Sequence, residues 1–272
     1  MTKKVLRTFQ YIFLSICAFV SIFPFFWMII AATNKSVDVT KGTLMPGSYF
    51  MENLKAVLSS DLQYTTAFKN SLIISVVTTI LAMIVSSAAG YAFVIYRSKS
   101  RERVFNIILL SMMVPLFRLF SKFNSVPLLK TIALNTPGAV IVIGISTAFL
   151  IFFFRQNTES FPKELIEAAR IDGVGELGIF FKIFMPTMKS TYAAAIIVTF
   201  MNSWNNYLWP LIALQSPERR TLPLVISAMG SSYTPDYGMM MTAVVLATVP
   251  TALIFFLMQK QFVAGMTGSV KG

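Results

Sequence analysis

Neutral hydrogen-bonding side chains gather in one long stretch that has no charged residue, 190–217. The candidate residues there are Thr199, Asn202, Ser203, Asn205, Asn206 and Tyr207. A helix would place Thr199, Asn202 and Asn206 near one face, because they follow i, i+3, i+7 spacing. Polar groups inside a membrane are costly and normally face a bundle interior or a wet cavity. Uncharged donors and acceptors beside aromatic rings suit an uncharged polyol such as a sugar, so this stretch is the candidate substrate pathway.

Two structural interpretations compete with this one. Asparagine side chains also tie neighbouring membrane helices together by hydrogen bonds. Tyr207 and Trp209 are equally the kind of residue that anchors a helix at the membrane interface. The stretch has no acidic or basic residue, which argues against a charged substrate but does not decide between these roles.

The composition excludes several kinds of catalytic site. The chain has no histidine and a single cysteine, Cys17. Ser–His–Asp triads, imidazole metal ligands, disulfide frameworks and four-cysteine zinc sites are thereby removed. The long apolar stretches contain neither carboxylates nor lysines. We therefore expect no catalytic residue, no metal site and no enzyme activity in this chain.

Charge concentrates in one segment, residues 155–189, which holds ten of the 34 charged residues. Pro162 and Glu164 are helix-start signals, and they precede the run 165–171. Asp172-Gly173 follows the run and is typical of a helix end. The pattern predicts a short helix that projects from the membrane.

The predicted short helix has small side chains on one face, because Leu165, Ala168 and Ala169 follow i, i+3, i+4 spacing. A second short helix is predicted from about residue 176 to residue 185, ended or bent by Pro186. The segment is either a solvated connector or a docking element for a partner protein.

The elements that must position these residues are membrane helices. Of the 272 residues, 56% are hydrophobic and only 12% charged, against about 25% charged in a soluble domain. Five charge-free stretches exceed the roughly 18–20 residues that cross a bilayer as a helix, and backbone in lipid must bond to itself. A shorter stretch, 104–117, becomes long enough if it continues to about Ser121 with Arg118 snorkelling to the interface. The predicted spans are 9–32, 70–96, 104–121, 138–154, 191–214 and 237–259.

The distribution of basic residues favours six spans with both termini cytoplasmic. Six spans put 14 lysines and arginines on one side and 9 on the other, whereas five spans give 12 against 11. The positive-inside rule therefore favours six, with 155–189 as a cytoplasmic loop. The first span is expected to be retained, since Pro24 and Trp27 stand where a signal peptidase needs small residues. Region 118–137 is untidy on this scheme and is interpreted as partly re-entrant or interfacial.

Three sequence motifs resemble the permease subunits of ABC importers. Glu167-Ala168-Ala169, then Gly173, Ile183 and Met185-Pro186, is similar to the EAA motif of these permeases, with Met185 in place of the usual leucine. Residues 204–211 and the tail 265–272 resemble the carbohydrate branch, of the maltose and multiple-sugar type. The likeness covers essentially the whole chain.

The resemblance implies a fold, a set of partners and a mechanism. The fold would be an all-α integral membrane domain over residues 1–272, of the type I ABC importer permease kind. The partners would be a homologous second permease, two ATPase subunits and an extracellular or periplasmic sugar-binding protein. The ATPase-coupling residues would be Glu164, Glu167, Ala168, Ala169, Asp172 and Gly173. Glu167 would accept a hydrogen bond from a basic residue of the ATPase, while Ala168 and Ala169 would permit close approach.

Nucleotide chemistry is expected on the partner. The chain has no G-x-x-x-x-G-K-[ST] segment, so ATP and Mg²⁺ would be bound by the ATPase and no cofactor by this chain. By the same resemblance, the outer loop 215–236 would probe the cleft of the binding protein. The location would be the bacterial cytoplasmic (inner) membrane, with several passes.

Other classes of protein remain to be compared with this one. The net charge of +12 is interpreted as a topology signal rather than a nucleic-acid footprint. A secondary active transporter working alone usually has internal repeats and an intramembrane ionisable group, and neither is found in the sequence. An intramembrane enzyme would need catalytic groups at membrane depth, which the composition does not supply.

Overall fold

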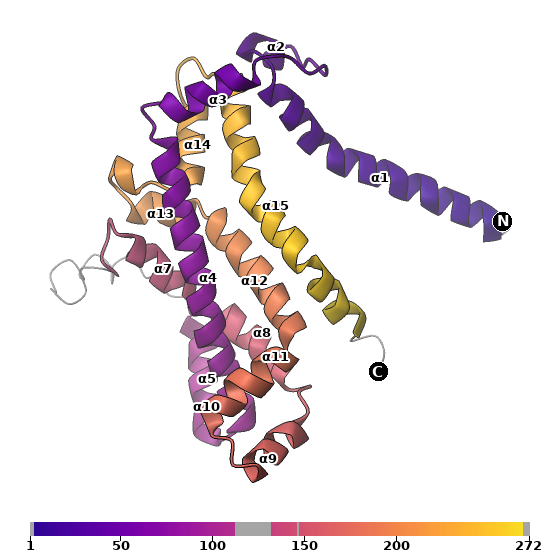
Figure 1. Ribbon diagram of the computed structural model, residues 1–272, viewed down its shortest axis with the longest axis vertical. Helices are drawn as coiled ribbons and strands as arrows, with labels where there is room; N and C mark the ends of the chain where they lie inside the picture. The colour runs from indigo at the N-terminus through magenta and orange to yellow at the C-terminus, as the bar shows by residue number, and fades with distance from the viewer. Residues whose placement is uncertain (1–2, 112–131, 146, 269–272) are drawn as a thin grey trace. The chain divides into compact units, whose positions relative to one another are not determined.

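The computed structural model describes residues 3–111, 132–145 and 147–268 (Figure 1). Within these ranges all regular structure is helical, which confirms the predicted all-α class. The helices are α1 (Lys3–Ala32), α2 (Ser36–Thr40), α3 (Phe50–Ser59), α4 (Tyr64–Ile95), α5 (Lys99–Ser111), α7 (Pro137–Ile145), α8 (Ala148–Thr158), α9 (Lys163–Ile171), α10 (Glu176–Ile179), α11 (Met185–Thr187), α12 (Lys189–Trp204), α13 (Leu208–Ala213), α14 (Leu222–Gly230) and α15 (Tyr237–Gly268). A π-helical turn at Phe180–Phe184 joins α10 to α11, and a 3₁₀ turn occupies Pro217–Arg219.

Among the described residues, four helical stretches are long and apolar enough to cross a membrane. They are Leu6–Ala32, Tyr64–Ile95, Pro137–Thr158 and Tyr237–Val263. They fall on four of the predicted spans, and the third includes residue 146, which lies outside the described residues. A fifth candidate pairs residues 176–187 with α12 across a bend of 81°. The number of spans and the side of the two termini stay predictions.

The predicted span 104–121 is only partly covered by the structure. Helix α5 occupies Lys99–Ser111, and residues 112–131 lie outside the described residues. The interpretation of 118–137 as re-entrant or interfacial therefore falls mostly outside them, and so does the end of the tail, 269–272.

The structure corrects the predicted span 191–214, because the helix stops inside it. Helix α12 ends at Trp204 and α13 begins at Leu208. Asn206 bonds the backbone locally, its Oδ1 accepting from Trp209 N at 3.3 Å, and such bonds compete with a continuing helix. Pro210 has no N–H for the carbonyl of Asn206 and would clash with it in a continuous helix. The last polar residues of the stretch therefore lie in a helix break rather than on a helix face.

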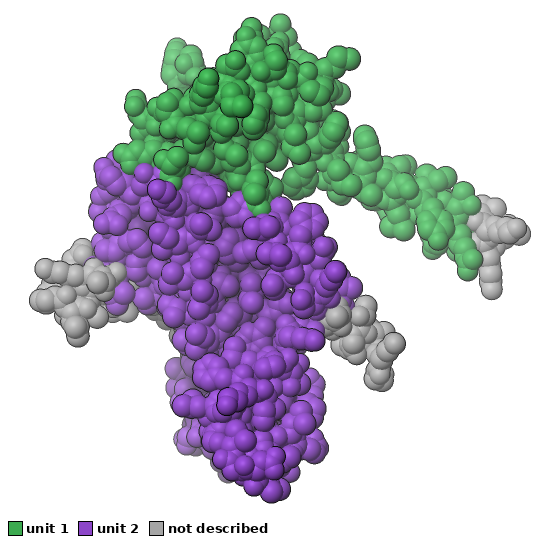
Figure 2. Space-filling model, viewed as in Figure 1, with its two compact units in different colours: residues 1–65, 225–249 green, residues 66–224, 250–272 purple. Residues whose placement is uncertain are grey.

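The described residues form two compact units, coloured separately in Figure 2. Unit 1 contains residues 1–65 and 225–249. The amide of Asn53 is its central polar connection, donating to the carbonyls of Ala32 and Asn34 at 2.9 Å each. Thr242 also donates to Ala32, at 3.1 Å. These bonds join α3 and α15 to the end of α1, whose apolar window is not buried inside the chain at all.

Unit 2 contains residues 66–224 and 250–272. Its core is aromatic: the Tyr91 ring of α4 lies 4.8 Å from that of Phe184, and the Phe154 ring of α8 lies 5.0 Å from that of Tyr192 in α12. Helices α4 and α8 touch at Gly90, where a Cβ would come within 2.7 Å of Phe154 Cβ. This rigid cluster positions both the projecting loop and the polar face of α12.

Candidate functional site

Helix α9 has both ends fixed by its own sequence. It begins at Lys163, after Pro162, and ends at Ile171, as the start and stop signals predict. Gly173 adopts φ +76°, and its N–H donates to Arg170 O at 3.1 Å. Val174 N donates to Ala169 O at 2.9 Å, which completes a Schellman motif. Gly173 is therefore required by the left-handed turn that ends α9.

One face of α9 is seated on the aromatic core of unit 2. Ile166 is 2% exposed and Ala169 is buried, both within the cluster formed by Phe161, Phe180 and Phe184. The opposite face is open. Ile171, a large apolar residue, is 86% exposed. The Ile171 side chain is therefore available for contact with a partner.

Five of the six residues predicted to couple to an ATPase lie on the open surface of this loop. They are Glu164, Glu167, Ala168, Asp172 and Gly173. The sequence predicts one shared face for Leu165, Ala168 and Ala169. In the structure Leu165 and Ala168 are exposed, whereas Ala169 is buried in the aromatic core. The small size of Ala169 serves packing inside the chain. Ile171 was not singled out by the sequence, though its position one turn beyond Glu167 and Ala168 could have indicated it.

A polar cluster fastens α9 to the end of α4. The Arg170 Nε donates to Glu176 Oε1 at 2.8 Å, and the Tyr96 hydroxyl donates to Glu176 Oε2. The hydrogen bonds from Arg170 and Tyr96 hold the pKa of Glu176 below its usual value, so the carboxylate is ionised at neutral pH. The Arg170–Glu176 pair is half exposed, so its contribution to stability is small. Through Glu176, the pair and the Tyr96 hydroxyl connect the end of α9 to the residue that follows α4.

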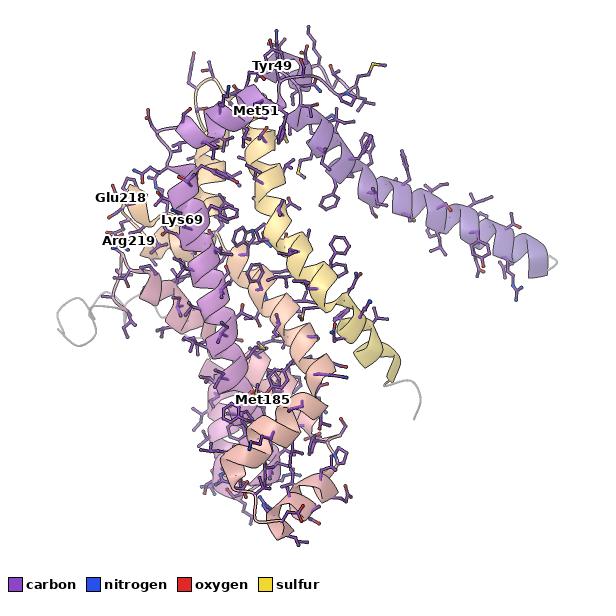
Figure 3. All side chains as sticks on the ribbon, viewed as in Figure 1. Tyr49, Met51, Lys69, Met185, Glu218 and Arg219 are labelled. Atoms are coloured by element: carbon purple, nitrogen blue, oxygen red, sulfur yellow. The ribbon has the colours of Figure 1, made fainter. Side chains whose placement is uncertain are left out.

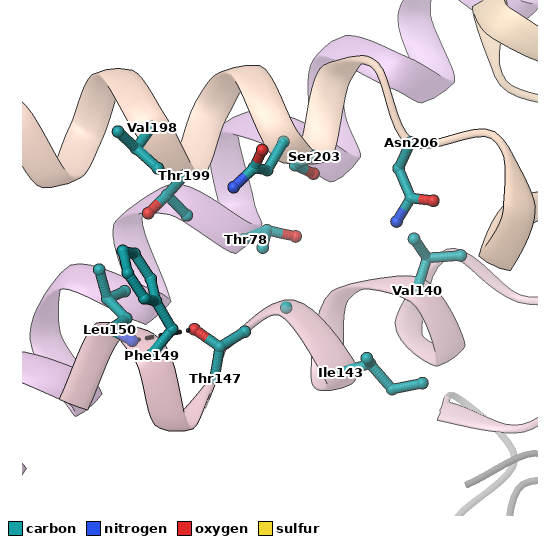
Figure 4. A pocket seen from close by; sticks show the side chains of 12 residues that line it. Thr78, Val140, Ile143, Thr147, Phe149, Leu150, Val198, Thr199, Ser203 and Asn206 are labelled. Atoms are coloured by element: carbon teal, nitrogen blue, oxygen red, sulfur yellow. Dashed lines mark hydrogen bonds between the residues drawn. The ribbon is translucent and has the colours of Figure 1, made fainter. Parts of the chain in front are cut away.

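The polar face of α12 lines a cavity of about 170 Å³ in unit 2 (Figure 4). Its twelve lining residues come from α4, α7, α8 and α12 and from the break after α12. The lining residues are Thr78, Val140, Ile143, Gly144, Thr147, Phe149, Leu150, Val198, Thr199, Asn202, Ser203 and Asn206. None of them is charged, so the cavity offers hydroxyls, amides and apolar walls.

The structure brings together four of the six predicted pathway residues. Thr199, Asn202, Ser203 and Asn206 line the cavity, whereas Asn205 and Tyr207 do not. The remaining polar wall comes from parts of the chain far away in sequence, with Thr78 and Thr147 among them. The spacing of residues within α12 could not predict that Thr78 and Thr147 would join this wall.

The polar groups of the cavity wall differ in burial and in hydrogen bonding. Thr78 is 2% exposed, and its hydroxyl has no hydrogen-bond partner among the described residues. Gly144 allows α7 to approach α4, because a Cβ there would lie 2.4 Å from Thr78 Cγ2. Asn206 points its carboxamide toward the cavity in Figure 4 while its Oδ1 also caps α13. Asn206 therefore has both a structural role and an exposed amide.

The tryptophans of this region are structural. Trp204 is buried and stacks on Phe200 with ring centroids 5.7 Å apart. Trp209 donates from Nε1 to Ala139 O at 3.1 Å, tying the segment after the break to α7. Neither residue lines the cavity.

The loop after α13 is held by hydrogen bonds between two asparagine side chains and its backbone. Asn135 has φ +64°, and its Oδ1 accepts from the backbone N–H groups of Gln215 and Ser216 at 3.1 and 3.0 Å. Asn70 donates from Nδ2 to the carbonyls of Glu218 and Arg220 at 2.9 and 3.0 Å. These bonds define the backbone of the loop without using its charged side chains.

Charged side chains extend from this fixed backbone. Lys69, Glu218 and Arg219 lie close together and are exposed (Figure 3). The first part of the predicted loop 215–236 is therefore a preformed surface.

Residues 96–268 match the protein family described as "Binding-protein-dependent transport system inner membrane component". The chain belongs to this family. The match includes α9, α12 and most of the cavity wall of the permease. It also decides against a secondary transporter that works alone.

Curated relatives align with nearly the whole permease. The lactose transport system permease protein LacG of Rhizobium radiobacter is 47% identical, over 96% of this chain and 95% of its own length. The arabinooligosaccharides transport system permease protein AraQ of Halalkalibacterium halodurans is 37% identical, over 94% and 93%. The sn-glycerol-3-phosphate transport system permease protein UgpE of Salmonella typhi is 30% identical, over 99% of both.

Solved structures show the fold of the permease. A chain of a bacterial ABC transporter involved in the import of the acidic polysaccharide alginate superposes with a TM-score of 0.82 at 21% identity, covering 96% of this chain and 99% of that one. An inward-facing MetNI methionine ABC transporter gives 0.55 at 18% identity, covering 73% and 94%. The predicted type I ABC importer permease fold is confirmed.

Proposed function

We propose that this permease is a membrane-spanning subunit of an ATP-driven, binding-protein-dependent importer for an uncharged sugar, specifically an oligosaccharide. The proposal rests on the uncharged cavity on the polar face of α12, in a chain that is 47% identical to a lactose permease. The hydroxyl and carboxamide groups of the wall can donate to and accept from the hydroxyl groups of a polyol.

The cavity forms one side of the substrate pathway. Its 170 Å³ is below the roughly 300 Å³ at which small-molecule pockets begin, so it accommodates part of a sugar. The homologous second permease supplies the facing wall. The alternative substrate is sn-glycerol 3-phosphate, carried by relatives that are 30% identical. A phosphate needs paired positive charge, which the cavity wall lacks.

The assembly contains this permease, a second permease, two ATPase subunits and a sugar-binding protein outside the bacterial cytoplasmic (inner) membrane. Both termini and the loop 155–189 face the cytoplasm, as the bias of lysine and arginine favours. ATP and Mg²⁺ are bound by the ATPase, so hydrolysis is not a reaction of this chain. The preformed loop that carries Glu218 and Arg219 meets the binding protein.

Coupling proceeds through α9. Its open face, with Glu167, Ala168 and Ile171, docks into a cleft of the ATPase. When two ATPases close on ATP, α9 moves with them. The seated face, through Ile166, and the Glu176 cluster transfer the displacement to α4 and the aromatic core. The cavity on α12 is thereby switched between inward-facing and outward-facing states.

The test is transport by the reconstituted assembly. Proteoliposomes containing the permease pair, ATPase and binding protein are expected to take up labelled lactose when ATP is enclosed, and the permease alone is expected not to. Glu167→Lys should abolish uptake and transport-coupled ATP hydrolysis while the protein still inserts. Glu52→Lys, the same charge reversal on exposed α3, is the matched control and should retain both activities. Normal uptake by Glu167→Lys would remove Glu167 from coupling, and preference for glycerol phosphate over neutral sugars would overturn the substrate class.

A further inference from the structure

A second cavity, of about 280 Å³, lies where α4 and α8 end, on the same side of unit 2 as α9. Its lining residues are Phe93, Val94, Arg97, Arg155, Glu159 and Lys163. Three of these six are cations and one is an acid. The substrate pathway and the coupling face leave this cavity without a role.

Two of the cations have no ionic partner inside the described chain. Arg97 follows the end of α4 and Lys163 begins α9, and neither forms an ion pair there. Arg155 is paired with Glu102 at 2.7 Å and lies over the Phe105 ring at 4.1 Å. The pair fixes the guanidinium in place and leaves most of its five N–H donors unused.

The charge balance fits a singly charged anion. Arg97, Arg155 and Lys163 carry three positive charges, against the two negative charges of Glu102 and Glu159. One positive charge remains, with several donors converging on a polar cavity. A phosphodiester brings one negative charge and two acceptor oxygens to such a site.

The location identifies the source of the phosphodiester. The apolar helix α4 ends at Ile95, so Arg97 lies at the level where a membrane helix meets water. Phe93 and Val94 form the wall toward the apolar side. Basic pockets between membrane helices on the cytoplasmic side hold anionic lipid headgroups.

We propose that this cavity binds the headgroup of an anionic glycerophospholipid, with Arg97, Arg155 and Lys163 around the phosphate and Phe93 and Val94 against its glycerol. Because Lys163 begins α9 and Arg97 follows the end of α4, the bound lipid bridges the two elements that the Glu176 cluster also joins. The inference goes beyond the proposed transport function and requires only that this end of α4 lie at a membrane surface.

The experiment counts lipid retained by the full chain. The chain is purified, with and without its ATPase, from nanodiscs of equal parts phosphatidylcholine and phosphatidylglycerol, and retained lipid is identified by native mass spectrometry. We expect one phosphatidylglycerol to be retained preferentially. Arg97→Gln with Lys163→Gln should weaken its apparent affinity about thirtyfold, since each cation near a membrane surface contributes about fivefold. Lys182→Gln with Lys189→Gln removes the same charge from exposed positions that do not line the cavity and should leave retention unchanged.

Three results would overturn the proposal. Equal retention by both double variants would place the lipid elsewhere. Equal displacement by soluble glycerol phosphate at the concentration of the lipid would make the ligand a free phosphate. Loss of the lipid whenever the ATPase is docked would assign the cavity to contact with that partner. None of these outcomes depends on sugar uptake, so failure here is distinguishable from failure of the transport proposal.

Discussion

The open face of α9 makes a quantitative prediction, because α9 carries two isoleucines in opposite surroundings. Ile171 is 86% exposed and Ile166 is 2% exposed. Replacing either by alanine removes three carbons, worth about 2.4 kcal/mol at about 0.8 kcal/mol for each buried carbon. For Ile171, about 2 kcal/mol of this is available only to a partner, and about 0.3 kcal/mol belongs to the fold.

Ile171→Ala should therefore leave the thermal midpoint of the purified permease unchanged and weaken its binding to the ATPase about thirtyfold. Ile166→Ala is the matched control, with the same chemistry on the same helix. It should destabilise the fold by about 2–5 kcal/mol, as buried isoleucine truncations do. The two measurements are a thermal unfolding curve and a titration of detergent-solubilised permease with ATPase.

The reasoning fails if the two variants behave alike. A fall in the thermal midpoint for Ile171→Ala would mean that another part of the chain covers this residue. ATPase affinity within about twofold of the parent would mean that the open face of α9 is not where the ATPase binds. Truncating an isoleucine that is buried in the interface would reduce the affinity by more than that.

Three further predictions concern the cavity and the glycines. Asn202→Ala should reduce sugar affinity in the uptake assay while leaving stability unchanged, whereas Asn206→Ala should lower both because it also caps α13; unchanged affinity and selectivity in both would leave these residues only a packing role. Gly173→Ala should destabilise the end of α9 by about 1 kcal/mol, because alanine is strained in the left-handed conformation, whereas Gly173→Asn should be tolerated. The measurement is ATPase coupling, as sugar taken up per ATP, and equal coupling in the two variants would contradict the prediction. Gly90→Ala should cost about 1–3 kcal/mol of stability by overpacking against Phe154, and an unchanged thermal midpoint would show that α4 and α8 separate easily.

Local structure could be predicted from the sequence where local chemistry decides it. Pro162 and the Asp172-Gly173 pair bound α9 because start signals and a left-handed glycine act within one turn. Asn206 and Pro210 are local signals for the end of α12. The predicted span nevertheless continued to residue 214, because the stretch has no charged residue through residue 217. Hydropathy says where a chain is apolar, and it does not say where a helix breaks.

The composition of the cavity could not be predicted in the same way. Thr78 and Thr147 meet the α12 face through packing between segments more than fifty residues apart, which spacing within one helix does not encode. The orientation of Ala169 was missed for the same reason, since only the aromatic cluster around Phe184 decides which side of α9 is inside.

Helices α1 and α4 differ in burial, and this difference determines which substitutions each of them tolerates. Both are apolar and of similar length, yet none of the apolar window of α1 is buried by the chain, while 44% of that of α4 is. No packing within this chain fixes the shape of α1, so as far as the chain's own core is concerned leucine, isoleucine, phenylalanine and valine are interchangeable there as long as the hydrophobic length is kept. The composition of α4 is set by shape: Ser86 and Ser87 are fully buried, and an added methyl group at Gly90 would meet α8. Random mutagenesis scored by transport should therefore find two different sets of tolerated residues. In α1 many apolar residue types should be accepted, whereas in α4 only residues of similar volume should be.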